Sequence, residues 1–251
     1  MRLNKHLVVI PVFNEVAHVA SVLRRARTYL PEILVVNDGS TDATTDVLAR
    51  EHGLHVIEHP ENHGYGQSLA DAFAFAIRRG YDWLTTMDCD EQHEPASIPH
   101  FVAAADRDCA DIISGSRYLE PYEGNGSPPA DRRAINRIIT GLLNERLGLR
   151  ITDAFCGFKA YRVSALSHFH ITVPGYGMPL QLWVQAVRAG LRIVELPVRL
   201  IYDDPSRHFG GHLDDPRMRL RHYLDVLYME LAAPPRNGRM RRPSRRDVTE
   251  R

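Results

Sequence analysis

The chain has 251 residues, of which 44% are hydrophobic and 25% charged, and this globular composition excludes collagen-like and wholly disordered proteins. Its 31 basic and 31 acidic residues cancel, which excludes the strong positive field typical of nucleic-acid-binding proteins. Three cysteines are too few for a disulfide framework, and no stretch has the roughly 18 to 20 apolar residues of a membrane span.

The first half of the chain alternates short apolar runs with amphipathic stretches. The apolar runs predict strands at residues 6–10, 33–36, 54–58, 83–87 and 111–114. The amphipathic stretches predict helices at residues 15–29, 68–79 and 98–105, with another that ends near residue 50. Strands and helices alternating at this spacing predict an α/β protein, whose parallel sheet carries helices on both faces. Ligands on such sheets bind at the carboxyl ends of the strands.

The second half is less regular. Its patterns predict helices at residues 130–147, 180–189 and 217–231, and strands at residues 158–162 and 192–196. We expect a single domain over residues 1–233, with a nucleotide-binding half of about 1–117 and an acceptor half of about 118–233. The remaining residues, 234–251, are expected to form a basic, disordered tail, because they contain seven arginines and almost no apolar side chains.

Three predicted strands end in acidic or polar segments. The first strand is followed by PVFNE (residues 11–15), the second by NDGSTD (37–42) and the fourth by MDCDEQ (87–92). Side chains two apart in a strand share a face, so Asp88 and Asp90 are expected to point the same way. Two convergent carboxylates suit Mg²⁺ or Mn²⁺, although a solvated acidic turn is an equal alternative for this pair alone.

Taken together, the motifs are much more specific. PVFNE, NDGSTD, NHGYGQ, MDCDEQ, GSRY and DAFCGFKAYR follow one another over residues 6–200, and in this order the chain resembles the family-two glycosyltransferases of the GT-A fold. The resemblance is greatest to the dolichyl- or polyprenyl-phosphate mannose or glucose synthases. It implies a Rossmann-like, mostly parallel central sheet with helices on both faces and an irregular acceptor-side C-terminal half.

The resemblance also implies roles for individual residues. The residues that it assigns to nucleotide-sugar binding are Pro11, Phe13, Glu15, Asn37, Asp38, Asp88, Cys89 and Asp90. It implies that Asp88, Asp90 and Gln92 hold the metal, and that the acceptor and donor phosphates contact Arg117, Arg132 and Arg207. Many relatives carry an aspartate where this chain has Asn37, and Arg133 competes with Arg132 for the matching position.

The implied activity is inverting transfer of a hexose from a donor of the GDP-mannose or UDP-glucose type to polyprenyl or dolichyl phosphate. The implied catalytic residues are Asp88, Asp90, Arg117 and Asp153. Relatives that glycosylate a hydroxyl carry a catalytic carboxylate in the segment matching residues 175–182. Here that segment reads GYGMPLQL, with Gln181 and no acid, which favours a phosphate acceptor because an ionised phosphate needs no base.

Three other functions compete with this one. Transfer to a sugar or polysaccharide hydroxyl would use Asp153 as the base, although that residue is equally well explained as a structural carboxylate. A sugar-1-phosphate nucleotidyltransferase is disfavoured, because PVFNE lacks the Gly-rich loop and basic residue that such enzymes carry after the first strand. A non-catalytic interaction module is disfavoured because the acidic pair and the Asp38 motif are intact.

Four histidines recur at short intervals between residues 52 and 63. They are His52, His55, His59 and His63. Gly53 and Pro60 interrupt any helix that would bring them together, so the pattern predicts surface and loop histidines and not a zinc site.

The apolar run at residues 7–12 is too short for a signal peptide, so we expect a cytoplasmic protein without a leader or membrane span. The basic tail carries a net charge of +5, from seven arginines less Asp247 and Glu250. It is explained either as a solubilising segment or as an electrostatic anchor beside the predicted helix at 217–231. Peripheral contact with a membrane therefore stays open, as do the donor sugar, the nucleobase and the oligomeric state.

Overall fold

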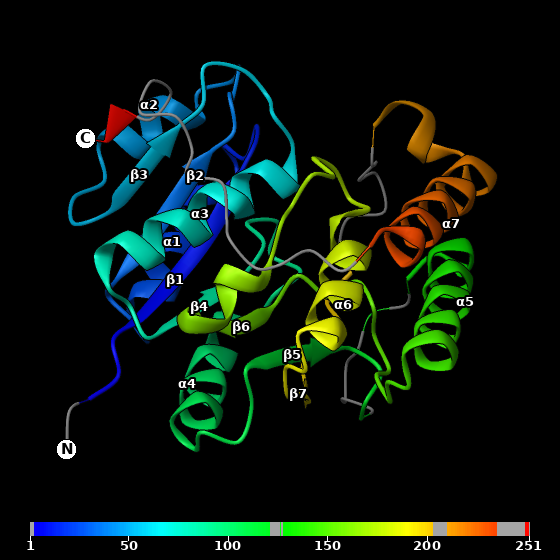
Figure 1. Ribbon diagram of the computed structural model, residues 1–251. Helices are drawn as coiled ribbons and strands as arrows, with labels where there is room; N and C mark the ends of the chain where they lie inside the picture. Colours follow the sequence, from blue (N-terminus) through cyan, green and yellow to red (C-terminus); the bar gives the residue numbers. More distant parts are fainter. Residues whose placement is uncertain (1–2, 121–125, 127, 203–209, 235–248, 251) are drawn as a thin grey trace.

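The computed structural model describes residues 3–120, 126, 128–202, 210–234 and 249–250, and it confirms the predicted α/β class (Figure 1). The described strands form one sheet in the order β7-β5-β6-β4-β1-β2-β3-β8. Their bounds are β1 His6–Val12, β2 Ile33–Asn37, β3 His55–Glu58, β4 Trp83–Thr86, β5 Ile112–Ser116, β6 Lys159–Arg162, β7 Ile193–Pro197 and β8 Thr249–Glu250. Strands β1 to β4 are parallel to one another, and β6 is antiparallel to both β4 and β5.

The helices cover both faces of this sheet. Their bounds are α1 Val19–Arg27, α2 Thr44–Ala49, α3 Tyr65–Arg79, α4 Ile98–Asp106, α5 Ala130–Leu147, α6 Met178–Arg188 and α7 Pro216–Ala232. Strand β1 shows how the faces are divided. Val8 and Ile10 pack in one apolar cluster with α1, α2 and α4, whereas Leu7 and Val9 pack in another with α3 and α6. This is the alternation expected of a strand buried on both faces.

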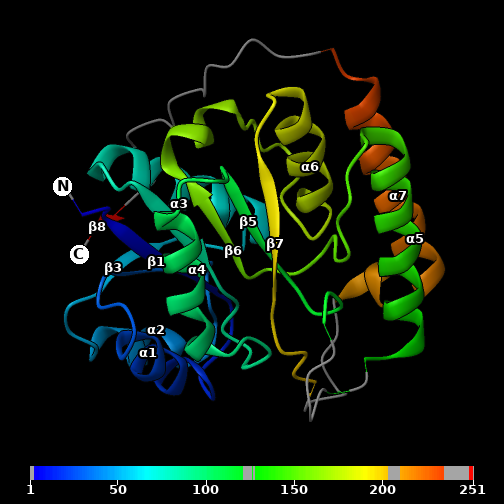
Figure 2. The same cartoon turned by 90° about the horizontal axis from the view of Figure 1, so that it is seen from below.

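A third apolar cluster lies beyond the sheet, where α5, α6 and α7 pack together. Its largest member is Trp183 of α6, which is 2% exposed and packs with Ile139 of α5 and Leu227 of α7. Figures 1 and 2 both show α5 and α7 side by side at the end of the molecule away from α2 and β3. The three helices predicted for this half are therefore confirmed, and they form an apolar core of their own.

Two helices begin three or more residues away from the predicted position. Helix α3 begins at Tyr65 and not at residue 68, because Gly64 takes a φ of 92° and lets the helix start directly after the NHG segment. Helix α1 begins at Val19 and not at residue 15, since residues 16–18 form a turn. In the tail, Thr249–Glu250 pairs antiparallel with Ile57 and Glu58, and residues 235–248 lie outside the described residues.

The turn after β2 packs tightly against the loop after β3. Gly39 has a φ of 70°, and a Cβ there would lie 2.2 Å from the carbonyl carbon of Glu61 and 2.6 Å from the nitrogen of Asn62. Both contacts are with backbone atoms, which cannot rotate away. The close approach joins two loops at the carboxyl edge of the sheet, and glycine is required there both for its conformation and for its size.

We expect Gly39→Ala to lower the free energy of unfolding by about 3 kcal/mol, because left-handed strain and overpacking act together. Gly80→Ala is the matched control, since Gly80 has a φ of 66° but a methyl group there would meet no atom within 4 Å. That variant should lose only about 1 kcal/mol. Urea denaturation of both variants measures the difference, and equal losses would contradict the close approach.

Candidate active site

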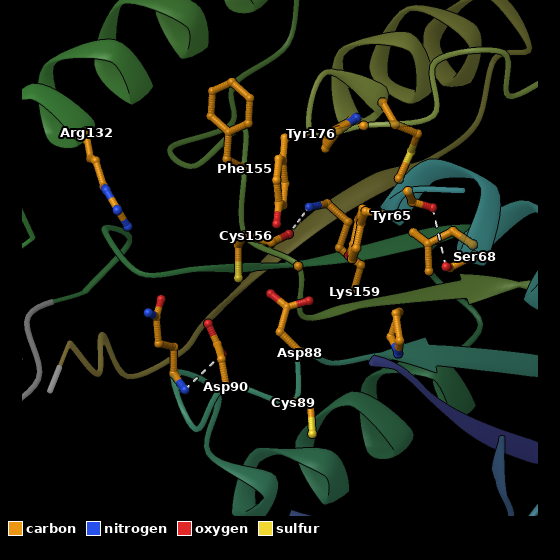
Figure 3. Close-up of a pocket in the computed structure, with 18 of the residues that line it drawn as sticks. Tyr65, Ser68, Asp88, Cys89, Asp90, Arg132, Phe155, Cys156, Lys159 and Tyr176 are labelled. Carbon is orange, nitrogen blue, oxygen red and sulfur yellow. Dashed lines mark hydrogen bonds between the residues drawn. The ribbon is translucent and has the colours of Figure 1, made fainter. Parts of the chain in front are cut away.

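A cavity of about 610 Å³ opens at the carboxyl ends of the parallel strands (Figure 3). Residues after β1, β2, β4 and β5 form one side, and residues of α3, α5, α6 and α7 form the other. The predicted site residues that line it are Pro11, Phe13, Glu15, Asp38, Asp88, Cys89, Asp90, Gln92, Arg117 and Arg132. Folding thus brings together residues from four separate strand exits, as the topology of a parallel sheet requires.

Asp88 and Asp90 lie just beyond β4, and Figure 3 shows both carboxylates pointing into the cavity. Because β4 ends at Thr86, the alternation of a regular strand does not account for their shared direction. The chain turns at Glu91, which has a φ of 59°, and the backbone nitrogen of Gln92 donates to Asp90 Oδ1 at 3.1 Å. The acidic pair therefore belongs to a tight turn held by its own hydrogen bond.

Gly157 explains how the Asp88 carboxylate fits against the neighbouring segment. A Cβ at Gly157 would lie 2.4 Å from Asp88 Oδ2. Burial raises the pKa of Asp88 above its ordinary value, although the positive charges of Lys159 and Arg117 offset part of this effect. The carboxylate is thus held in a confined position, where a cation would favour its ionised form.

The side-chain oxygens of Asp88, Asp90 and Gln92 are suited to a hard divalent cation that would also bind a substrate. Two carboxylates and the side-chain amide of Gln92 supply oxygen ligands of the kind that Mg²⁺ and Mn²⁺ prefer. No group of three or more His, Cys, Asp or Glu side chains arranged for a metal occurs among the described residues. Such a site is incomplete without other oxygen ligands, which suits a metal that enters with a diphosphate.

Two predicted nucleotide-binding residues direct their side chains elsewhere. Cys89 is 3% exposed and packs in the apolar cluster beneath the site, and Figure 3 shows it pointing away from Asp88 and Asp90. Asn37 does not line the cavity. Its Nδ2 donates to Thr45 Oγ1 at 2.9 Å, and its Oδ1 accepts from the backbone nitrogen of Ser40 at 3.3 Å.

Asp38 lines the cavity but is 4% exposed and holds the loop in front of α3. Its Oδ1 accepts from His59 Nδ1 at 2.6 Å and from the His63 backbone nitrogen at 2.9 Å. Its Oδ2 accepts from the Gly64 backbone nitrogen at 2.8 Å. Burial alone would raise the pKa of Asp38, but these hydrogen bonds outweigh burial and lower it. Most of its hydrogen-bonding capacity is therefore used within the protein.

His59 differs from the prediction for the histidine group. It is 7% exposed and not a surface residue, since the loop after β3 folds over it. His52 and His63 are exposed and His55 is half-buried, as the pattern predicted. The burial of His59 depends on carboxylates of Asp38 and Asp71 that lie far from it in the sequence.

Asp153 is fully buried and does not line the cavity. Arg117 binds it in a bidentate pair, with Nε 2.6 Å from Oδ2 and one terminal nitrogen 2.9 Å from Oδ1. Asn136 Nδ2 also donates to Oδ1 at 2.7 Å. Burial would raise the pKa of Asp153, but Arg117 and Asn136 hold it far below its usual range. A carboxylate in these surroundings orients Arg117 and is poorly suited to accept a proton.

The predicted phosphate-binding arginines are placed as follows. Arg117 and Arg132 line the cavity and the neighbouring Arg133 does not, which favours Arg132 as the residue at that position. The guanidinium of Arg132 lies 5.5 Å from the ring centre of Tyr202. Arg207 lies outside the described residues.

Two charged residues of the cavity were not predicted from the sequence. Lys159 is 5% exposed and projects from β6, where its ammonium lies 5.4 Å from a ring of Trp183 and bonds to the backbone carbonyl of Cys156. Burial lowers its pKa. Arg219 of α7 is 2% exposed, lines the cavity and pairs with Asp131. A lysine within an apolar strand was the available signal for Lys159, whereas nothing local in the sequence singles out Arg219.

The charges in the cavity are unevenly distributed. The carboxylates that line it within the described residues are Glu15, Asp38, Asp88 and Asp90, and all four follow β1, β2 or β4. The acceptor half adds Arg132 and Arg219 with several tyrosines. Gln181 does not line the cavity, and its side chain bonds to Thr172 and Glu230.

Comparison with known proteins places these features in a family. The sequence model of Glycosyl transferase family 2 matches residues 7–169. The chain is 33% identical over 218 residues to an undecaprenyl-phosphate mannosyltransferase from Micrococcus luteus, covering 82% of this chain and 88% of that protein. It is 31% identical over 202 residues to a polyprenol monophosphomannose synthase from Mycolicibacterium smegmatis, covering 76% of each.

Among solved structures, the chain is similar to glucosyl-3-phosphoglycerate synthase from Mycobacterium tuberculosis, crystallised with Mn²⁺, uridine diphosphate and phosphoglyceric acid. The TM-score is 0.69 at 22% identity, with 92% of this chain and 80% of that chain covered. This similarity confirms the predicted GT-A fold.

The pairing of Arg117 with Asp153 makes a prediction for stability. Asp153→Asn and Arg117→Met should each lower the free energy of unfolding by about 3 kcal/mol, because each leaves a buried charge without its partner. The double variant should lose about 1 to 3 kcal/mol less than the sum of the two. Urea denaturation at pH 7 measures all three, and additive losses would contradict the pairing.

The pairing also predicts how the free energy of unfolding changes with pH. Because the pKa of Asp153 is lowered in the folded chain, its contribution is complete above the ordinary value of 3.8 and is lost as the pH falls below it. Arg192→Met is the matched control for Arg117→Met, since Arg192 pairs with Asp111 at the surface and is half exposed. The free energy of unfolding lost in Arg192→Met should be much smaller than that lost in Arg117→Met.

Proposed function

Because the chain belongs to glycosyl transferase family 2, we propose that it transfers a hexose from a nucleotide-diphosphate sugar to polyprenyl phosphate with inversion at the anomeric carbon. The observation that carries this proposal is the meeting of Asp88 and Asp90 with Arg117 and Arg132 around one cavity. In the proposed arrangement, the donor binds to the half formed by residues 1–117, and the acceptor enters from the half formed by residues 118–233.

The donor diphosphate would lie between the acidic turn after β4 and the start of α3. Asp88, Asp90 and Gln92 are the residues that would hold Mg²⁺ or Mn²⁺, and a cation bound there would supply Lewis-acid stabilisation of the departing diphosphate. Gly64 and Tyr65 line the cavity where α3 begins, so the N-terminal end of this helix faces the same region. The backbone nitrogens of Gly64 and Gly66 already donate to Asp38 and to the Pro174 carbonyl, so the diphosphate would meet the helix end mainly through its dipole. A helix N-terminus favours phosphate binding.

The arginines complete the charge balance. As the bond between the sugar and the diphosphate breaks, negative charge develops on the leaving oxygen, and a preorganised cation stabilises that charge. Asp153 and Asn136 fix the orientation of Arg117 before any substrate binds, so its guanidinium loses little freedom on binding. Arg132 extends the positive surface toward the acceptor half, where Arg219 also lines the cavity but is paired with Asp131.

A phosphate acceptor agrees with this distribution of charge. A phosphomonoester is largely ionised at pH 7, so it attacks the anomeric carbon without a protein base. The cavity surface of the acceptor half provides arginines and tyrosines, and its described residues add no carboxylate. The names of the relatives from Micrococcus luteus and Mycolicibacterium smegmatis support a polyprenyl carrier.

Transfer to a sugar hydroxyl is the second candidate, with Asp153 as the base. The geometry gives it less support, because Asp153 has no exposed surface and both of its oxygens accept hydrogen bonds from other side chains. A donor of the GDP-mannose or UDP-glucose type fits either reaction.

Contact with the membrane surface is part of the proposal. No helix among the described residues combines the length and apolarity required to cross a bilayer. Helix α7 exposes Met218, Tyr228 and Met229, and Ile138 of the neighbouring α5 is also exposed. We propose that these side chains and the basic tail bring the cavity to a lipid-linked acceptor at the membrane surface, where each arginine contributes about 1 kcal/mol at best.

The proposed reaction is tested by nucleotide release from a panel of UDP- and GDP-sugars, with polyprenyl phosphate or a soluble sugar as acceptor. We expect release with the lipid phosphate and Mg²⁺ or Mn²⁺, and none in EDTA. Asp90→Ala should lower turnover by at least about 100-fold, since a group that stabilises charge in the transition state is lost. Asp46→Ala, an exposed aspartate of α2, is the matched control.

Full activity of Asp90→Ala or in EDTA would contradict the metal assignment. Transfer to the sugar but not to the lipid phosphate would favour the second candidate, and no turnover with any donor would contradict both.

Membrane contact is tested by co-sedimentation with anionic liposomes. The full chain should bind at low salt and be released at high salt, because charges at a surface are screened. A variant ending at Ala233, which lacks all seven tail arginines, should bind more weakly. Equal binding by both chains would assign the contact to α5 and α7 alone, and binding by neither would contradict the proposal.

A further inference from the structure

His59 lies directly after β3 with a carboxylate at each of its ring nitrogens. Its Nδ1 is 2.6 Å from Asp38 Oδ1, and its Nε2 is 3.1 Å from Asp71 Oδ2. An ionised carboxylate has no hydrogen to donate, so both ring nitrogens must carry one. With both carboxylates ionised, this geometry favours the positively charged imidazolium form of His59.

The groups around His59 come from three parts of the chain. Asp38 follows β2, Asp71 belongs to α3, and the ring of His63 stacks on that of His59 with their centres 4.9 Å apart. Gln67 Nε2 donates to the same Asp71 oxygen at 2.9 Å, which orients that carboxylate toward His59. Burial alone would lower the pKa of His59, but the hydrogen bonds to Asp38 and Asp71 outweigh burial and raise it to about 9.

Asp38 connects His59 to residues at the edge of the cavity. The same Asp38 carboxylate accepts the backbone N–H groups of His63 and Gly64, the last two residues before α3. The backbone nitrogen of His59 in turn donates to the Asn37 carbonyl at 2.9 Å. Asp71 lies within α3 itself, so His59 joins the end of β2 to both the start and the body of that helix.

We propose that the imidazolium of His59 is a positioning residue for nucleoside diphosphate binding, holding Asp38 and Asp71 so that the first turn of α3 keeps its place at the edge of the cavity. The inference rests on the proposed function, in which the diphosphate binds near α3. His59 itself does not line the cavity, so it acts through Asp38, which does.

Loss of the ring proton would disturb this arrangement. A neutral imidazole donates from one nitrogen only, so one of the two carboxylates would face a bare ring nitrogen. Two largely buried negative charges would then lie on either side of a neutral ring. Because the pKa is raised from 6.5 to about 9, the stabilisation is complete below pH 6.5 and is lost as the pH rises through about 9.

The charge state is tested directly by NMR of the full chain with ¹⁵N-labelled histidine. Both ring nitrogens of His59 should give imidazolium signals at pH 7.5 and titrate near pH 9, and His59→Gln should lack them. Asp71→Asn removes one carboxylate and leaves His59 in place, so the midpoint should move to lower pH. His52→Gln, at an exposed histidine, should leave the midpoint unchanged.

The positioning role is tested by calorimetric titration with UDP, GDP and inorganic pyrophosphate from pH 7 to 10. His59→Gln should weaken binding about tenfold or more at pH 7.5, the effect of losing a hydrogen bond to a charged group. The wild-type affinity should fall through pH 9, and that of Asp71→Asn at lower pH. The nucleobases of UDP and GDP and pyrophosphate itself also lose protons in this range, but these ionisations are the same for every variant. The difference in midpoint between wild type and Asp71→Asn therefore separates the effect of His59 from that of the ligand.

The outcomes distinguish the two proposals. Neutral ring signals at pH 7.5 would overturn the imidazolium assignment. Equal affinity of wild type and His59→Gln would overturn the positioning role while leaving the proposed function intact. If the wild type binds no nucleoside diphosphate at any pH, the proposed function fails and the positioning role fails with it, although the NMR result on His59 still stands by itself. If His59→Gln does not fold, the shifted midpoint of Asp71→Asn decides the inference.

Discussion

The buried carboxylate of Asp153 is the constraint on which the acceptor half of the molecule depends. Its oxygens accept from Arg117 after β5 and from Asn136 of α5, and its own backbone nitrogen donates to Glu195 of β7 at 3.2 Å. A charge with no exposed surface is tolerated only when it is paired and hydrogen-bonded. The segment that follows Asp153 also carries Gly157, which packs against the Asp88 carboxylate on the other side of the cavity.

A second charge network stands on the donor side, and it differs from the first in composition. Asp153 is balanced by an arginine, which stays charged at every physiological pH. Asp38 and Asp71 share one histidine, whose charge is lost near pH 9. At alkaline pH, loss of the His59 proton should therefore loosen the donor side of the cavity, while the Arg117–Asp153 pair keeps the acceptor side ordered. At acid pH, protonation should first affect the carboxylates on both sides, Asp38 and Asp153.

Much of the fold was predictable because its signals are local. Apolar runs bounded by turn residues predicted the strands. Because β1, β2 and β4 run in the same direction, the segments that follow them, PVFNE, NDGSTD and MDCDEQ, meet at one edge of the sheet. The roles of Asp153 and His59 were not predictable in the same way. Arg117 and Asp153 are 36 residues apart, and Asp38 and His59 are 21 apart, so the environment of each depends on the completed sheet. Whether a carboxylate accepts a proton or orients an arginine depends on burial and partners, which the motif alone does not specify.

The two networks also bear on the choice of acceptor. An enzyme that glycosylates a hydroxyl needs a carboxylate that is ionised, accessible to substrate and free to take a proton in the transition state. In this cavity the accessible carboxylates, Glu15, Asp88 and Asp90, all lie on the donor side, and a diphosphate with its cation would occupy Asp88 and Asp90. Asp153 is enclosed, and its pairing with Arg117 makes protonation unfavourable. Arg132 makes the remaining polar surface of the acceptor half cationic, whereas Arg219 is buried and paired with Asp131, so this surface favours an acceptor that is already negative. A lipid phosphate meets this condition, and a neutral sugar does not.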